Sequence, residues 1–505
     1  MTFFAAIPPL QPPAAHDLIG LLPVLIVSGT FVLLLMADLF TPPTRRTWLA
    51  AFSVLGMVVA LVTSVLQWND AGTARTVYYG SYAYDRYTLF FNVVLLATGI
   101  LSVMISPAYL NRRGMHFGEY YALILACMAG MMLLAGAASL MVIFLAVELL
   151  SIALYILTGF ARGEERSQEA GLKYLLLGGF ASGFLIYGMA LVYGTTGHTQ
   201  LEQIAAALRV GGPVDPLFLI GAVMMFVGFA FKISAAPFHT WTPDVYQGAP
   251  TSVTAFMSVA TKVAAFAVLI RVFTYTFTPT PAYDRWSGVI AFVAIISMVV
   301  GNVAALSQTS LKRVLAYSGI AQAGYILIGV ALHTPDATIA SLYYLAAYAA
   351  TNLGAFAVLT LMAGRGEDLD SYDSIRGLWH RHPYVAVALG WFLLSLGGFP
   401  LTAGFVGKLL LFRAAIDAHF ILLAFWGVVT SAISVVYYLR VALLMFAPRK
   451  GGEEGYEWSR STFAGSTVLA TTAAATLLLG VAVVLVYSAA AAAQQGIFPH
   501  GLGSG

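Results

Sequence analysis

Six side chains that can gain or lose a proton lie within long apolar stretches of this sequence. Glu148 is near the middle of the run SLMVIFLAVELLSIALYILTGF, where a bare carboxylate is poorly solvated. The other five are Lys173, Lys232, His239, Lys262 and Lys408. A charged side chain at the centre of a bilayer costs at least ~2.5–3.5 kcal/mol on insertion scales, so these residues are candidates for a function.

The chemistry that such residues can perform together is proton transfer. Burial disfavours the charged form of a lysine and a nearby carboxylate favours it, so Glu148 can set whether a neighbouring lysine holds its proton. One charge crossing 100 mV involves about 2.3 kcal/mol. The free energy of making or breaking one buried ion pair is of about this size, so it can drive or gate a proton step.

The alternative for each group is a buried polar residue that only fixes helix packing. Lys173 lies near the start of its apolar stretch, so its ammonium can equally reach the membrane surface by snorkelling. The same holds for Arg271, Arg413 and Arg440. His239 alone would more often be structural, and its position beyond a broken helix is what makes it a candidate. Glu148, Lys232, Lys262 and Lys408 favour a functional interpretation.

The composition places the chain in a membrane. Hydrophobic residues make up 60% of the 505 residues, charged residues only 9%, and the mean hydropathy is +0.85, whereas soluble domains carry about 25% charged residues. The net charge of +3 is spread over many short loops, so the chain has no concentrated basic segment of the kind that binds nucleic acid. Cys127 is the only cysteine, which excludes disulfides within the chain, iron–sulfur ligation and thiolate zinc sites.

About fourteen stretches are long and apolar enough to span a bilayer. They cover about 17–40, 47–68, 86–107, 119–136, 138–160, 171–194, 216–238, 251–276, 284–307, 313–333, 336–364, 383–416, 418–448 and 460–490. With the N-terminus outside, fourteen loop Lys and Arg residues fall on one side and four on the other. Because such residues collect in cytoplasmic loops, both termini are predicted on the non-cytoplasmic side. The first residues do not resemble a signal peptide, so we expect the first helix to be retained.

Two of these stretches are interrupted just where a lysine occurs. Pro237 follows Lys232 by five residues and removes a backbone hydrogen bond, so the helix should kink or unwind there. In SLGGFPLTAGFVGKLL, glycines and a proline precede Lys408. Irregular backbone at membrane depth survives only inside protein or beside a water-filled cavity, so we expect the first break to face the bundle interior. Interrupted segments about 175 residues apart suggest an internal repeat and a transport site.

Several motifs resemble those of one family. They are FKISAAPFHTWTPDVYQGAPTSVTAF, LKRVLAYSGIAQAGY, GGFPLTAGFVGK, FLAVELLSIALYIL and EAGLKYLLLG. Together, over about residues 85–450, they resemble the antiporter-like membrane subunits of respiratory NADH:quinone oxidoreductase, complex I, and most closely its subunit N branch. Subunit M is similar but carries a glutamate where Lys408 stands. Subunit L is similar but has a long C-terminal extension, whereas this sequence ends about fifteen residues after its last predicted span.

The resemblance implies an all-α fold of about fourteen transmembrane helices with two inverted five-helix repeats, each containing a broken helix. Three N-terminal helices (1–118) would precede repeat one (119–276) and repeat two (284–448). Residues 449–505 would form a cytoplasmic loop and the last helix.

By the same resemblance, Glu148 would pair with Lys232, and Lys173 would modulate that pair. His239 and Lys262 would continue a hydrated path at the membrane midplane to Lys408.

The function implied is proton translocation by a non-redox subunit of this translocase in the bacterial inner membrane. No cofactor is expected in this chain, while flavin, iron–sulfur clusters and quinone are expected in partner subunits. The implied partners are other membrane-arm subunits, of the M type and the small J and K types, with membrane lipid and no nucleic acid. The alternatives are a subunit of a multisubunit cation/proton antiporter and a purely structural membrane scaffold.

Overall fold

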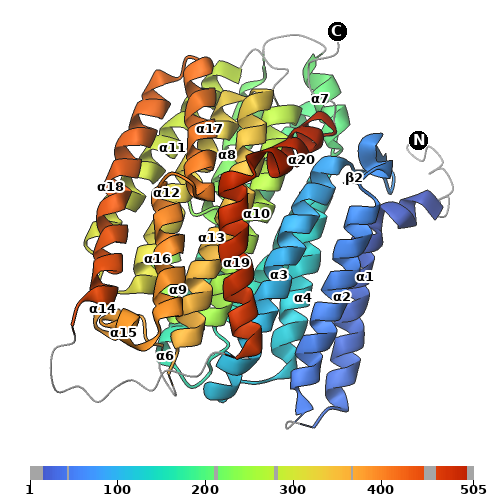
Figure 1. Ribbon diagram of the computed structural model, residues 1–505. Helices are drawn as coiled ribbons and strands as arrows, with labels where there is room; N and C mark the ends of the chain where they lie inside the picture. The colour runs from blue at the N-terminus through green and yellow to red at the C-terminus, as the bar shows by residue number, and fades with distance from the viewer. Residues whose placement is uncertain are drawn as a thin grey trace.

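The computed structural model describes residues 15–42, 45–209, 214–277, 283–364, 368–448 and 462–497, and is almost entirely helical (Figure 1). The predicted cytoplasmic loop between the spans 418–448 and 460–490 and both chain ends lie outside these residues. The first half contains α1 (Ala15–Leu39), α2 (Thr47–Leu66), η2 (Asp70–Gly72), β1 (Arg75–Val77), β2 (Tyr82–Tyr84), α3 (Arg86–Arg112), α4 (Gly118–Ala135), α5 (Leu140–Thr158), α6 (Glu165–Thr196), α7 (Leu201–Arg209), α8 (Pro216–Lys232), α9 (Trp241–Gly248), α10 (Thr251–Leu269) and η3 (Ile270–Thr276). The second half contains α11 (Tyr283–Leu306), α12 (Leu311–Leu332), α13 (Pro335–Met362), α14 (Tyr372–Ile375), α15 (Leu378–Arg381), α16 (Pro383–Gly397), α17 (Ala403–Asp417), α18 (Ile421–Phe446), α19 (Phe463–Val481) and α20 (Val483–Gln495).

The described helices account for the predicted number of membrane spans. Twelve of them are long and apolar enough to cross a bilayer on their own. Two broken pairs, α8 with α9 and α16 with α17, supply one further span each. The prediction of an all-helical protein with about fourteen spans is therefore confirmed.

The predicted last span, 460–490, is too long. α19 ends at Val481, and the chain turns at Ala482 (φ −93°, ψ 51°) into α20, which lies across one end of the bundle (Figure 1). The sequence on both sides of the turn is rich in alanine and valine, so hydropathy alone does not register the change of direction.

The first predicted helix break is confirmed. α8 ends at Lys232, Ser234 adopts φ +64°, and the helical path resumes only at Trp241. The carbonyl of Phe231 accepts from the indole of Trp241 (3.1 Å) and from the backbone N–H of Ser234 (3.1 Å), so this carbonyl beside the break is satisfied inside the protein. The break faces the interior only in part, because residues 233–236 are buried whereas Pro237 is exposed.

The second predicted break lies between α16 and α17. Gly398, at φ +84°, ends α16 in a left-handed conformation that glycine adopts without steric penalty. The hydroxyl of Ser395 accepts a hydrogen bond from the backbone N–H of Gly404 (3.1 Å) and so satisfies the restart of the helix. Both breaks are therefore built into the bundle with internal partners for their polar groups.

The centre of the bundle is formed by α10, α12 and α13. Every residue of α10 is buried, and α12 and α13 are buried over most of their length. The outer helices, such as α1, α6 and α18, expose leucine, isoleucine and phenylalanine side chains instead. A helix that is buried on all sides belongs to the core of a bundle, so Lys262 on α10 is deep inside the protein.

Arg271 was expected to reach the surface, and this expectation is wrong. It is fully buried and forms an ion pair with Asp85, whose carboxylate accepts from Nη1 at 2.8 Å. Asp85 also caps α3 by accepting from the backbone N–H of Thr88 (2.7 Å). The pair thus joins the start of α3 to η3, which directly continues the central helix α10.

Close approach of α6 and α8 depends on small residues. A Cβ atom at Gly188 on α6 would lie 2.5 Å from the backbone carbonyl oxygen of Gly221 on α8. Interfaces between membrane helices use small residues in this way, because the backbones can then touch.

We predict that Gly188→Leu destabilises the protein, since α8 would have to move away from α6. Overpacking of this kind typically costs about 1–3 kcal/mol. The matched control is Gly183→Leu on the same helix, where an added Cβ meets no atom within 4 Å. Thermal unfolding in detergent should show a lowered transition only for the Gly188 variant; equal melting of both variants would contradict the packing argument.

Candidate functional site

Lys232, the last residue of α8, lies in a buried pocket formed with α5 and α6. Its ammonium donates to the hydroxyl of Ser151 on α5 (2.7 Å), and its side chain is 5% exposed. The ring centroids of Tyr155 and Tyr174 lie 5.5 and 5.4 Å from Nζ, within the range of a cation–π interaction. The lysine is therefore held by a hydroxyl and two aromatic faces.

Glu148 does not form the expected direct ion pair with Lys232. Both residues are described by the structure, and Ser151, one turn after Glu148 on α5, contacts the lysine instead. The Oε1 atom of Glu148 is buried and has no hydrogen-bond partner among the described residues. Since residues three apart share a helix face, Ser151 stands next to the carboxylate on the side of Lys232.

Lys262 lies at the centre of the bundle with no exposed surface. Its ammonium donates to the phenol of Tyr246 on α9 (3.0 Å) and to the hydroxyl of Ser234 in the first break (3.4 Å). Ser234 follows Lys232 by two residues, so the unwound segment leads from one lysine to the next. The break therefore brings a hydroxyl to Lys262.

Lys408 on α17 is placed against the second break. Its ammonium donates to the backbone carbonyls of Leu396 (2.9 Å) and Gly397 (3.4 Å) and to the hydroxyl of Ser431 (2.9 Å). These carbonyls belong to the last turn of α16, whose helix dipole favours a cation. The ring centroid of Tyr325 is 4.7 Å from Nζ.

Neutral polar side chains lie between Lys262 and Lys408. Gln322 on α12 donates to the carbonyl of Leu396 (3.2 Å), which Lys408 also contacts, and accepts from the phenol of Tyr344 on α13. One turn further along α13, the phenol of Tyr348 lies beside Gly319, as does Nζ of Lys262. These residues place polar groups at intervals through the core from Lys262 to Lys408.

These neutral residues were not among the candidates predicted from the sequence. Ser151, Ser234, Gln322, Tyr344 and Tyr348 add little cost to an apolar stretch, so they do not stand out in hydropathy. The available signal was the four-residue spacing of Tyr344 and Tyr348, which puts both on one face of a helix.

The structure does not bring Lys173 to Lys232. Lys173 is 41% exposed and forms ion pairs with Glu169 (2.6 Å) and with Asp244 on α9 (3.1 Å). It is the next residue, Tyr174, whose ring faces Lys232. A one-residue step on a helix turns the side chain by about 100°, and this rotation places Lys173 on the outer side.

His239 does not lie among the three buried lysines, Lys232, Lys262 and Lys408. It is half-buried beyond the exposed Pro237, and none of the hydrogen bonds of Lys232 or Lys262 involves it. Ser234 occupies the place between the two lysines that was expected for the histidine. Within the described residues, no group of three His, Cys, Asp or Glu side chains could hold a metal ion.

A second charged cluster surrounds Asp368, in the loop after α13. Its carboxylate accepts from Lys312 (2.5 Å), Arg113 (3.2 Å), Tyr109 (3.0 Å) and Thr251 (2.7 Å). These four residues belong to the ends of α3, α10 and α12. Asp368 therefore ties three helix ends together at one side of the membrane.

Residues 137–434 match the family model described as "NADH:quinone oxidoreductase/Mrp antiporter, TM". NADH-quinone oxidoreductase subunit N of Trichlorobacter lovleyi is 45% identical over 443 residues, which cover 88% of this chain and 90% of that relative. A chain of respiratory complex I from Thermus thermophilus, solved with bound aureothin, is 35% identical with a TM-score of 0.79, covering 93% of this chain and 99% of that chain.

A chain of the Mrp complex from a Dietzia species superposes with a TM-score of 0.81 but only 22% identity, covering 96% of this chain and 98% of that chain, so this likeness shows the fold alone. The chain belongs to the NADH:quinone oxidoreductase/Mrp antiporter transmembrane family. Its place within that family is with the subunit N chains of complex I, as the motifs predicted.

The Asp368 cluster predicts a pH dependence. Burial by itself would raise the pKa of Asp368, but Lys312 and Arg113 outweigh it and hold the pKa below its ordinary value of 3.8. A carboxyl with a lowered pKa contributes stability that is present above its ordinary pKa and is lost as the pH falls below it. The cluster should therefore stabilise the protein at neutral pH and weaken in strong acid.

We predict that Asp368→Asn lowers the thermal transition at neutral pH, because Lys312, with a side chain 1% exposed, would lose its counter-ion and Arg113, 2% exposed, would keep only Glu164. Removing one partner of a buried pair costs about 3–5 kcal/mol. Asp373→Asn is the control, since Asp373 is 72% exposed and only loosely paired. An Asp368 variant that melts like the control would contradict the proposed role of the cluster.

Proposed function

We propose that this chain is a proton-translocating membrane subunit of NADH:quinone oxidoreductase in which Lys232, Lys262 and Lys408 hold and pass protons at membrane depth. The observation that carries the proposal is that all three ammonium groups are buried and are held by hydroxyls or backbone carbonyls. A carboxylate in contact would favour the charged form strongly, whereas these partners favour it less. Each lysine can then be charged in one step of a cycle and neutral in another.

The neutral residues between the lysines suit a relay. A hydroxyl can both donate and accept, and a glutamine side chain carries both functions on one amide. Ser234 and Tyr246 lie at Lys262, and Gln322 and Tyr344 lie towards Lys408. With water in the remaining gaps, a proton can pass from lysine to lysine along hydroxyls and water without any large movement of a helix, and Gln322 orients this path through its hydrogen bonds.

Glu148 acts in this proposal as the charge that biases Lys232. Its unpartnered oxygen leaves the carboxylate free to change its position or its protonation state. When it is ionised, it stabilises the charged form of Lys232, next to which Ser151 stands. A change at Glu148 thereby alters the proton affinity at the first lysine of the row.

Lys173 is proposed to act indirectly, as a positioning residue. Its ion pair with Asp244 holds α9, and the same short helix carries Tyr246, which contacts Lys262. Arg313 binds the other oxygen of Asp244 (2.8 Å). His239, at the exposed side of the first break, stays in the proposal as a group that can exchange protons with water or a neighbouring chain.

Redox chemistry is assigned to partner subunits, with flavin, iron–sulfur clusters and quinone bound there and no cofactor in this chain. The partners proposed are the membrane-arm subunits of the M type and the small J and K types. Residues 119–276 and 284–448 would form the two repeats, each with one broken helix. The setting is the bacterial inner membrane, with both termini on the non-cytoplasmic side.

We predict that Lys408→Ala abolishes most NADH-driven proton pumping in membrane vesicles, because the proposed path from Lys232 through Lys262 then ends without a group that can hold the proton. The control is Arg413→Ala on the same helix, since Arg413 is 78% exposed and Lys408 is buried. Proton uptake and quinone reduction are measured in parallel. Unchanged pumping and reductase activity in the Lys408 variant would remove the mechanism. Absence of flavin and iron–sulfur subunits from the purified complex would instead favour an antiporter.

We predict a smaller effect for Ser151→Ala, in which Lys232 loses its hydrogen-bond acceptor. Hydrogen bonds to charged groups contribute about 1.5–3 kcal/mol, or roughly a factor of 10–100 in a step that depends on them. Ser151→Thr keeps the hydroxyl and should restore pumping. If the alanine and threonine variants pump protons equally well, the hydroxyl has no part in proton transfer.

A further inference from the structure

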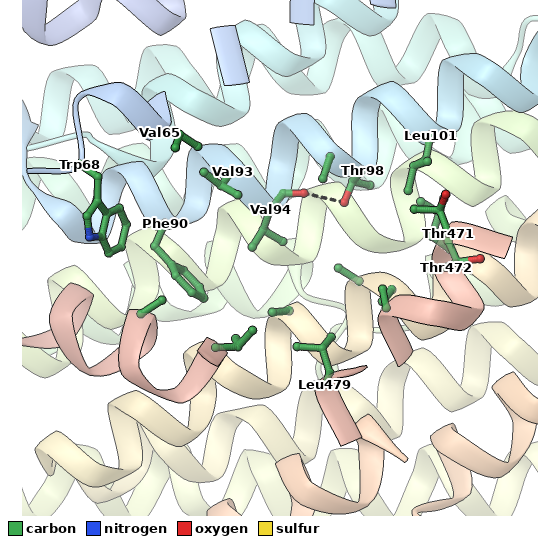
Figure 2. A pocket seen from close by; sticks show the side chains of 18 residues that line it. Val65, Trp68, Phe90, Val93, Val94, Thr98, Leu101, Thr471, Thr472 and Leu479 are labelled. Atoms are coloured by element: carbon green, nitrogen blue, oxygen red, sulfur yellow. Dashed lines mark hydrogen bonds between the residues drawn. The ribbon is translucent and has the colours of Figure 1, made fainter. Parts of the chain in front are cut away.

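A separate cavity of about 430 Å³ lies between the N-terminal helices and the C-terminal part of the bundle (Figure 2). It is partly open and is bordered by α2, α3, α13, α19 and α20. Representative lining residues from these segments are Trp68, Phe90, Leu101, Ala350, Thr472 and Val486. None of the lysines described above lines it, so the cavity is distinct from the proposed proton path through Lys232, Lys262 and Lys408.

The cavity is unsuited to water. It is lined by alanine, valine, leucine and aromatic side chains, and two of its hydroxyls already have partners in their own helices. Thr98 donates to the carbonyl of Val94 (2.8 Å), as Figure 2 shows, and Thr472 donates to that of Val468 (2.8 Å). A buried water needs two to four polar partners, and an empty cavity forfeits dispersion contacts along its wall. An apolar occupant is therefore favoured.

A helix of a partner subunit, with its side chains, is at least about 10 Å wide. A single hydrocarbon chain is narrower and fits a cleft between helices. Since α2, α3, α13 and α19 are all long enough to span a membrane, the cavity lies at the depth of the lipid hydrocarbon.

One end of the cavity carries features of a lipid headgroup site. Trp68 and Phe90 lie together at that end, away from Leu101 and Thr471 (Figure 2). Arg86 is one turn before Phe90 on α3, and its Nε donates to the carbonyl of Trp68 (3.1 Å). Within the described residues, Arg86 forms no ion pair. Tryptophan marks the headgroup level of spans, and a guanidinium binds phosphate oxygens well.

We propose that this cavity binds one acyl chain of an anionic membrane phospholipid whose phosphate lies against Arg86. The chain fills the space between α3, α13 and α19, and so joins the N-terminal helices to the second half of the bundle. The charge of Arg86 selects an anionic headgroup, while the dry cavity selects a hydrocarbon chain.

The test uses the intact complex that contains this chain, reconstituted in nanodiscs with phosphatidylglycerol carrying a diazirine on one acyl chain. After illumination, mass spectrometry should find labelled peptides within 90–101, 346–353 and 471–489. Ala350→Phe places a ring in the cavity and should lower this labelling about tenfold, as expected for an overpacked site. Ala51→Phe, at an exposed position on α2 outside the cavity, is the matched control and should leave it unchanged.

The headgroup is tested by competition with unlabelled phosphatidylglycerol and phosphatidylcholine. The wild-type protein should favour the anionic lipid, and Arg86→Gln should remove that preference while labelling of the cavity continues. If Ala350→Phe does not assemble, the same competition on the wild-type complex decides the question. Labelling outside the cavity, equal labelling in the Phe variants, preferential labelling by a diazirine-bearing isoprenoid quinone, or no preference for the anionic lipid would overturn the proposal.

Discussion

A polar backbone group at membrane depth must find its partner inside the protein, and the surroundings of the three buried lysines, Lys232, Lys262 and Lys408, are organised around this constraint. Each break in a helix frees carbonyls and N–H groups that need partners. At the second break, Lys408 supplies the donor to the carbonyls of Leu396 and Gly397. At the first break, the indole of Trp241 donates to the carbonyl of Phe231, and the unwound backbone places the hydroxyl of Ser234 in contact with Lys262. The breaks therefore give buried lysines partners that carry no charge.

The two broken helices use different partners for their lysines. Lys232 is held by the side chains of Ser151, Tyr155 and Tyr174, which can rotate, whereas Lys408 is held mainly by fixed carbonyls at the end of α16. A site with movable partners can respond to a neighbouring charge, and a site with fixed partners has less freedom to do so. This difference agrees with a role for Glu148 at the first site only.

The remaining charges serve a different purpose, which is to hold the ends of helices in position. Asp368 joins α3, α10 and α12, and Asp244 joins α6, α9 and α12 through Lys173 and Arg313. The buried pair of Asp85 and Arg271 does the same at η3, which directly follows the other end of α10. Because α10 is fixed at both ends, Lys262 is kept at a constant depth in the core.

The sequence by itself determined the membrane setting, the number of spans, the two breaks, the titratable residues within them and the family, because apolar length, proline and glycine act locally. Only the tertiary structure decided which way each side chain faces. It put the hydroxyl of Ser151 in contact with Lys232 in place of the Glu148 carboxylate, turned Lys173 outwards, and put Ser234 where His239 was expected. The rotation of a helix about its axis depends on all of its neighbours, so the direction in which each side chain faces could not be obtained from one sequence. The neutral polar partners could not be identified either, because such residues change the hydropathy of a stretch very little.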